Sequence, residues 1–239
     1  MRYIISDIHG CYDEYMELLK KINLKDSDEL YILGDVVDRG PAPIKVLQDM
    51  MMRVNVFPII GNHDLIALLM LKKLNVEITE ENVESYLTDD DLKEYMQWLK
   101  EGGATTVEGF LKLDEDEKQD IIEYLEEFSA YHEINIDGKR YILVHASLNN
   151  FEEDKELDEY MLHDLLFCRM DYTKRYFSDE NTYIVTGHTP TAFMREDKKP
   201  LIYEGNGHIA IDCGCVFGGK LAAYCLDNGE VYYVEGEKR

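Results

Sequence analysis

Short runs of apolar residues alternate with helical spacings of apolar residues in the first third of the chain. Residues 3–6 form one such run, and beyond a polar loop the apolar positions Tyr12, Tyr15, Met16 and Leu19 recur at the spacing of one helix face. The succession repeats as far as about residue 74. This pattern predicts strands that alternate with helices, which is typical of an α/β domain.

The middle of the chain, residues 75–130, is poor in strand patterns and predicts helices. One apolar stripe is formed by Leu92, Tyr95, Met96 and Leu99, and another by Ile121, Ile122, Leu125 and Phe128. From residue 131 onward β patterns dominate, with hairpin turns predicted at Asp137-Gly138 and Asn228-Gly229. We therefore expect one α/β domain over residues 1–239, a β-sandwich flanked by helices, with residues 75–130 as a helical insertion or cap within it.

The apolar runs end in charged or metal-binding residue types. The stretch "YILGDVVDRG" passes from aliphatic residues directly into Asp35, Asp38 and Arg39. A carboxylate at the end of a buried strand loses hydration, so it needs a cation, a proton or several hydrogen bonds. Four further runs end in the same manner, in "SDIHG", "GNHD", "VHAS" and "TGHTP", which contain Asp7, His9, Asn62, His63, His145 and His188.

Each of these endings also has a simpler interpretation when it is taken alone. An aspartate after a strand is often a helix N-cap, Gly-Asn is common in turns, and a lone histidine is more often structural than a ligand. The recurrence of ligand types at five strand ends is improbable for capping alone. A metal site on an α/β sheet gathers its ligands from several loops in this way, so the pattern favours a metal centre.

In this order the motifs resemble the signature of the phosphoprotein phosphatase branch of the calcineurin-like metallophosphoesterases. That branch includes bacterial serine/threonine phosphatases and symmetrical diadenosine tetraphosphate hydrolases. The resemblance extends to the final "IAIDCGCVFGGKLAAYCL" and implies a four-layer α/β/β/α sandwich. One departure is Ile60, which stands where eukaryotic members carry an arginine before Gly-Asn-His, so eukaryotic phosphoserine specificity does not transfer directly.

The resemblance also implies a role for each motif residue. The implied ligands of two divalent ions are Asp7 and His9 at one site, Asp35 as the bridge, and Asn62, His145 and His188 at the other. Manganese is the predicted ion, with iron or zinc as alternatives. A hydroxide that bridges the ions would attack the phosphorus.

The remaining motif residues are expected to act on the substrate itself. His63 would protonate the leaving oxygen, Asp38 would orient it, and Arg39 would bind the phosphoryl oxygens. Arg169 is expected to be a second phosphate-binding residue, with a surface salt bridge, or Arg175 in that role, as alternatives.

Composition limits which kinds of molecule the protein is expected to bind and in which cellular compartment it is expected to be found. With 49 acidic and 25 basic residues the formal charge is −24, which would repel nucleic acid polymers and anionic membranes. The chain has no apolar run of membrane-spanning length and starts directly with a strand pattern. Its five cysteines are an odd number, which favours reduced thiols and a cytoplasmic location. Cys213 and Cys215 lack the rest of a zinc ligand set.

Three functions agree with these observations. The first, which the sequence favours, is a phosphatase that acts on phosphoserine or phosphothreonine in proteins. The alternative is a dinucleoside polyphosphate hydrolase, whose adenine pocket would need aromatic residues; Tyr86, Tyr95 and Trp98 are candidates, although core packing explains them more simply. The third, a non-enzymatic metal-binding module, is disfavoured because the expected acid, its orienting carboxylate and the phosphate-binding arginine are all present.

Overall fold

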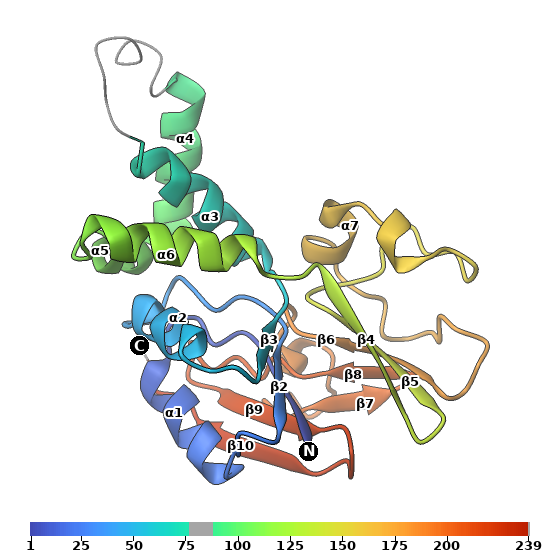
Figure 1. Ribbon diagram of the computed structural model, residues 1–239. Helices are drawn as coiled ribbons and strands as arrows, with labels where there is room; N and C mark the ends of the chain where they lie inside the picture. The colour runs from blue at the N-terminus through green and yellow to red at the C-terminus, as the bar shows by residue number, and fades with distance from the viewer. Residues whose placement is uncertain (77–87, 239) are drawn as a thin grey trace.

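Two five-stranded sheets form the body of the computed structural model, which describes residues 1–76 and 88–238 (Figure 1). The first sheet has the order β10-β9-β1-β2-β3. Its strands are β1 (Arg2–Ile5), β2 (Glu29–Ile32), β3 (Val56–Pro58), β9 (Lys220–Cys225) and β10 (Val231–Glu235). Strands β1, β2 and β3 are parallel to one another, whereas β9 and β10 are antiparallel additions at one edge.

The second sheet has the order β4-β5-β6-β8-β7 and also contains three parallel strands. Its strands are β4 (Tyr131–Ile136), β5 (Lys139–Val144), β6 (Thr182–Thr186), β7 (Tyr203–Gly205) and β8 (His208–Ala210). Asp137 and Gly138 join β4 to β5 with positive φ angles of 49° and 78°, as a tight hairpin turn requires. Both predicted hairpins are therefore present, the second between β9 and β10.

Helices cover the outer faces of the two sheets. The helices are α1 (Tyr12–Lys21), α2 (Pro43–Met51), α3 (Asn62–Leu74), α4 (Asp89–Trp98), α5 (Ala104–Phe110), α6 (Glu115–Glu126) and α7 (Leu162–Leu166), with a π-helical turn η1 (Leu99–Gly103) and the short 3-10 turns η2 (Leu157–Glu159) and η3 (Thr191–Phe193). In Figure 1, α1 and α2 lie beside the first sheet, α7 lies near the second, and α3 to α6 rise above the sandwich. The α/β/β/α sandwich implied by the sequence is confirmed.

Alternation along the strands explains why the sheets stack. On β1, Ile4 faces the core between the two sheets, while Tyr3 and Ile5 face the helix side. On β2, likewise, Tyr31 faces the core between the sheets and Ile32 faces the helix side. Successive strand residues point to opposite faces, so a strand with apolar residues at every position must be covered on both sides.

Of the two apolar stripes predicted in the middle helices, the one on α6 is buried as expected and the one on α4 is not. Leu125 of α6 is completely buried, as predicted. On α4, however, Leu92 and Met96 are exposed, and the most deeply buried side chain is that of Trp98. Among the described residues no helix is long and apolar enough to cross a membrane.

Candidate active site

The residues predicted from the motifs follow the carboxyl ends of parallel strands in both sheets. Asp7 and His9 follow β1; Asp35, Asp38 and Arg39 follow β2; Asn62 and His63 begin α3 just after β3; His145 follows β5 and His188 follows β6. Open α/β sheets form their ligand sites at this end of the strands. The fold therefore assembles most of the predicted residues at one place, although they are spread over more than half of the sequence.

Several of these residues have left-handed backbone conformations, which residues other than glycine rarely adopt. The φ angles are 51° at Asp7, 44° at His9, 52° at Asp35, 69° at Asp38, 66° at Arg39 and 64° at His188. Each such residue costs about 1–3 kcal/mol and persists where the surrounding structure enforces it. Strain concentrated in this way marks the strand ends as a functional site.

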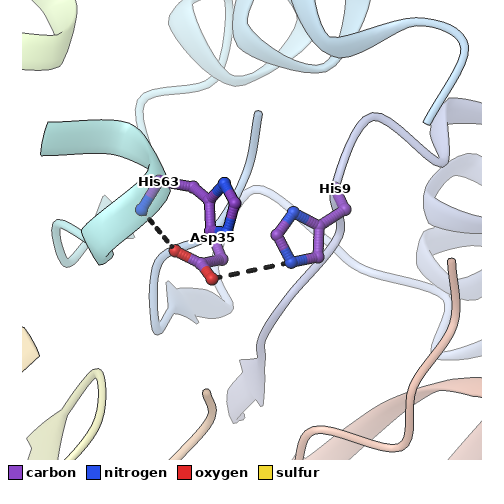
Figure 2. Close-up of side chains that lie close together, drawn as sticks. All are labelled: His9, Asp35 and His63. Carbon is purple, nitrogen blue, oxygen red and sulfur yellow. Dashed lines mark hydrogen bonds and ion pairs between the residues drawn. The ribbon is translucent and has the colours of Figure 1, made fainter. Parts of the chain in front are cut away.

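Asp35 lies at the centre of the site, between imidazole rings on two sides. Its Oδ2 is 3.5 Å from Nε2 of His9, and its Oδ1 is 3.4 Å from Nε2 of His145. The backbone N–H of His63 also donates to Oδ1, at 3.0 Å (Figure 2). Burial raises the pKa of Asp35, but the facing imidazoles, His145 first, outweigh it and lower that pKa below its ordinary value.

On one side of Asp35, an amide oxygen and two imidazole nitrogens face one another. Asn62 Oδ1 lies 3.0 Å from His145 Nε2 and 2.9 Å from His188 Nδ1, and the two ring nitrogens are 3.2 Å apart. His145 places its Nδ1 2.6 Å from the carbonyl of Leu33, so the proton is on Nδ1 and Nε2 presents a lone pair. Lone pairs that converge on one point repel one another unless a cation lies between them, so this set fits a metal ion.

On the other side, His9 is oriented in a similar manner. Its Nδ1 donates to the carbonyl of Val37 at 2.8 Å, which leaves a lone pair on Nε2, the atom that the Arg39 guanidinium contacts and that lies 3.5 Å from Asp35 Oδ2. Burial lowers the pKa of His9 to about 3, so the ring is neutral, as a metal ligand must be. The ligand atoms of His9, Asp35 and His63 lie within 4.8 Å of one another.

Asp7 is present at the site but belongs to neither of these groups among the described residues. Its carboxylate accepts a hydrogen bond from Ser6 Oγ and two from the backbone N–H of His188, at 3.0 and 3.2 Å. Burial, followed by the charges of Asp212 and Asp35, raises the pKa of Asp7 well above its ordinary value. A bound cation would offset this repulsion.

Asp38 and His63 form a buried pair that the middle helices hold in place. His63 Nδ1 donates to Asp38 Oδ2 at 2.7 Å. The same oxygen accepts from Trp98 Nε1 at 2.9 Å, and Oδ1 accepts from Thr106 Oγ at 2.7 Å. Asp38 is completely buried, and these donors satisfy its carboxylate oxygens in the absence of solvent contact.

The pair also affects the protonation of His63. Burial lowers the pKa of His63, but the hydrogen bond to Asp38 and the charge of Asp35 outweigh it and raise that pKa above the ordinary value. With Nδ1 committed to Asp38, a second proton on this ring would be carried by Nε2. Nε2 lies 2.6 Å from Nη2 of Arg39, in the space at the centre of the site.

Arg39 and Arg169 lie on the cavity beside the site. The Arg39 guanidinium contacts His9 Nε2 and lies 5.4 Å above the ring of Phe217. Arg169 and His188 line the same cavity, and this cavity has a volume of about 500 Å³. Arg175 instead donates to the backbone carbonyls of residues such as Asp179, at 2.9 Å.

Sequence reasoning missed three polar residues at this site. Trp98 was considered only as a stacking or core residue, and Thr106 was not considered. Asp212 is buried next to the cavity, follows β8 and accepts from the backbone N–H of Gly214 at 2.8 Å. Its burial raises its pKa to about 7. "IAID" is a further apolar run that ends in aspartate, so the criterion applied to the other runs could have found it.

Comparison with known proteins agrees with the family that the sequence motifs resemble. A family model of calcineurin-like phosphoesterases matches residues 3–234. The asymmetrical bis(5'-nucleosyl)-tetraphosphatase PrpE of Geobacillus sp. (strain WCH70) is 30% identical over 250 residues, which cover 92% of this chain and 88% of that protein. The symmetrical bis(5'-nucleosyl)-tetraphosphatase of Buchnera aphidicola subsp. Schizaphis graminum (strain Sg) is 26% identical over 276 residues, which cover 99% and 98%.

A solved structure shares the fold over the whole chain. It is a crystal structure of a protein provisionally named a diadenosine tetraphosphatase, with a TM-score of 0.64 and 22% identity. The superposition covers 100% of this chain and 94% of that one. At this identity the similarity shows the fold alone.

The central position of Asp35 predicts the effect of removing its charge. Asp35→Asn should lower the affinity for Mn²⁺ by on the order of 10²-fold or more. Replacing a residue that only hydrogen-bonds to a metal ligand already lowers metal affinity by about 10–100-fold, and Asp35 is expected to be a ligand itself. Metal content after dialysis, measured by mass spectrometry, and hydrolysis of nitrophenyl phosphate should fall together. Asp26→Asn, which removes one exposed carboxylate elsewhere, is the matched control. A variant at Asp35 that retains both metals and full turnover would refute the assignment.

The indole N–H of Trp98 predicts a second, weaker effect. Trp98→Phe keeps a ring in the core but removes one donor to Asp38, a bond to a charged group worth about 1.5–3 kcal/mol. We expect kcat for an unactivated phosphate ester to fall about tenfold or more while metal content is unchanged. Tyr95→Phe is the control, since Tyr95 packs against Trp98 with 6.0 Å between ring centroids. Equal turnover in Trp98→Phe and Tyr95→Phe would show that the indole donor has no such role.

Proposed function

Since the chain belongs to the calcineurin-like phosphoesterase family, we propose that it hydrolyses bis(5'-nucleosyl) tetraphosphates at a two-metal centre. Hydrolysis of a phosphoric ester or anhydride bond is the activity common to this family and to the related tetraphosphatases. The choice of substrate, the identity of the metal and the roles of individual residues are the parts proposed here. A cytoplasmic location, predicted from the cysteines, belongs to the same proposal.

The proposed metal ligands are those predicted from the motifs. They are Asp7, His9, Asp35, Asn62, His145 and His188, with Mn²⁺ as the proposed ion and iron or zinc as alternatives. When bound, two divalent ions supply activated water and neutralise the phosphate oxygens. The facing lone pairs of Asn62 and His145 support this ligand set.

The protein's own proposed contributions are a proton and a phosphate clamp. His63 would donate the proton on Nε2 to the leaving oxygen, because its Nδ1 is held by Asp38. Arg39 would bind the non-bridging oxygens through its planar guanidinium, and Arg169 would bind phosphate farther along the cavity.

The observation that carries the choice of substrate is the aromatic wall of the cavity beside the site. Phe193 and Phe217 are 67% and 61% exposed, and both line the cavity that contains Asp7, His9 and Arg39. A nucleobase that stacks on an exposed aromatic ring gains about 1–3 kcal/mol. The cavity, about 500 Å³, lies in the range of small-molecule sites.

The names of the relatives support this alternative better than the phosphoprotein phosphatase that the sequence favoured. Both relatives described above are named for bis(5'-nucleosyl) tetraphosphate hydrolysis. The aromatic candidates differ from those expected, however. Trp98 is 1% exposed and belongs to the core, Tyr95 is partly buried against it, and Tyr86 lies outside the described residues.

We also propose that residues 75–130 are a helical insertion in a single domain, residues 1–239. The chain leaves the first sheet at the end of β3 and returns beside the same point, where Ser129 forms a bridge with Ile59 and exchanges backbone hydrogen bonds with Pro58 and Ile60. An excursion with adjacent ends is what an insertion requires, and the excursion between these ends also takes in α3, which precedes residue 75. Its proposed role is to support Asp38 through Trp98.

Steady-state kinetics on two substrates test the proposed function. With Mn²⁺-loaded protein, kcat/KM should be about tenfold or more higher for diadenosine tetraphosphate than for a phosphoserine peptide. This ratio corresponds to the binding free energy of one base stacked on an aromatic ring. Phe193→Ala should reduce this preference, with Leu111→Ala as the control because Leu111 is equally exposed, at 62%, and lies outside the cavity. A higher kcat/KM for the phosphopeptide would replace the proposal with a protein phosphatase.

The assignment of His63 as the acid predicts how a substitution depends on the leaving group. His63→Asn should retain both metals and lose turnover by about 10²–10⁴-fold on an alkyl phosphate. The loss should be smaller for nitrophenyl phosphate, whose leaving group needs little protonation. Metal loss, or an equal loss on both esters, would instead identify His63 as a ligand, for which its place beside His9 and Asp35 offers a route.

A further inference from the structure

A second cavity beside the site carries positive charge in a chain that is strongly negative overall. It has a volume of about 390 Å³, and its lining includes Asn149, Asn150, Arg169, Lys174, Arg175 and Tyr176. None of the described residues that line it is acidic, although the chain has a formal charge of −24. The second cavity is therefore a local exception to the charge of the molecule.

The second cavity adjoins the proposed active site at Arg169. Arg169 lines both cavities, with His188 and Asp7 in the first. Ser147, at the wall of the second, is two residues from His145 in the loop that follows β5. Arg169 therefore presents its guanidinium to both cavities.

Arg169 and Lys174 of the second cavity are open to a ligand, whereas the Arg175 guanidinium donates to backbone carbonyls. Among residues 1–76 and 88–238 no carboxylate lies within ion-pair distance of Arg169, Lys174 or Arg175. All three side chains are exposed to solvent. Cations that share a concave surface attract anions, and arginine and lysine both bind phosphate oxygens.

Other contacts hold the wall of the second cavity in place. Arg175 donates to the carbonyls of Asp179 at 2.9 Å and Thr182 at 3.4 Å, and the Lys174 ammonium lies 4.7 Å from the ring centroid of Tyr176. The Lys174 carbonyl accepts from His208 Nε2 at 2.9 Å. A site whose backbone is fixed before binding loses less entropy when the ligand binds.

The opposite wall is a loop anchored from behind. Asn149 and Asn150 each donate through Nδ2 to Asp164 Oδ1, at 2.9 Å. Asp164 is buried, so its charge is covered by these amides and by the protein behind them. The asparagine contacts explain how a polar wall can stand beside the three cations without placing a carboxylate in the second cavity.

We propose that the second cavity binds the phosphate chain of the second nucleotide in a dinucleoside polyphosphate. The inference rests on the proposed function, in which the bond to be cleaved lies at the metal centre and one nucleoside occupies the aromatic first cavity. A dinucleotide has phosphates and a nucleoside on both sides of that bond, so the other half requires a site of its own. Lys174 and Arg169 supply the charge for it, whereas a phosphate monoester has no second half to occupy it.

Charge reversal at Lys174 tests the inference. Lys174→Glu should raise KM for diadenosine tetraphosphate about tenfold or more beyond any change in KM for nitrophenyl phosphate. This factor corresponds to the free energy of one hydrogen bond between a charged side chain and the ligand. Lys174→Arg should restore the wild-type KM. The matched control is Lys139→Glu, because Lys139 is also exposed and lies over a tyrosine ring, Tyr183, at 5.8 Å, but lines neither cavity.

The outcomes separate the inference from the proposed function. If the wild-type protein hydrolyses diadenosine tetraphosphate and Lys174→Glu has the same KM as Lys139→Glu, the second cavity has no such role while the function stands. If the wild type does not hydrolyse the dinucleotide, the proposed function is wrong. Calorimetric titration with inorganic tripolyphosphate then decides on the second cavity, since weaker binding by Lys174→Glu than by Lys139→Glu supports an anion site and equal binding overturns it.

Discussion

The carboxylate of Asp35, buried between imidazole rings from two sheets, is the constraint on which the rest of the structure depends. It must lie close to His9 of the first sheet and His145 of the second, so the parallel strands of both sheets must end at the same place. The packing leaves no room for adjustment: a Cβ on Gly61 would lie 2.3 Å from the Asp35 backbone nitrogen and from Oδ1. The left-handed conformation of Asp35 itself, at a φ of 52°, is part of this arrangement.

The middle helices are joined to the same centre through two side chains, Trp98 of α4 and Thr106 of α5, which both donate to Asp38. The Trp98 indole reaches Asp38 from the end of α4, and a Cβ on Gly103 would approach that indole to 2.4 Å, so only glycine fits beneath the ring. Gly102 adds a backbone bond, since its carbonyl accepts from the N–H of Arg39 at 2.9 Å. These contacts explain why α4 has little other buried surface: its packing is concentrated at the end that touches the site.

The strands and the ligand-type residues could be predicted from the sequence because both are local features. An apolar run followed by Asp, His or Asn can be recognised within ten residues, and the order of the motifs then indicated the family. The partners of Asp38 could not be predicted in this way. Trp98 and Thr106 lie 60 and 68 residues away from it, and nothing in the local pattern links an indole to a carboxylate at that distance. The exposed Leu92 and Met96 show the same limit, since periodicity identifies a helix face but not what covers it.

The central claim is that lone pairs from both sheets converge on two cation positions that share Asp35. Crystals grown with Mn²⁺ and measured at the manganese absorption edge would locate the ions directly by anomalous scattering. The account predicts two peaks, one among Asp7, His9 and Asp35 and the other among Asp35, Asn62, His145 and His188. A single peak, no peak, or peaks that do not share the Asp35 carboxylate would contradict it.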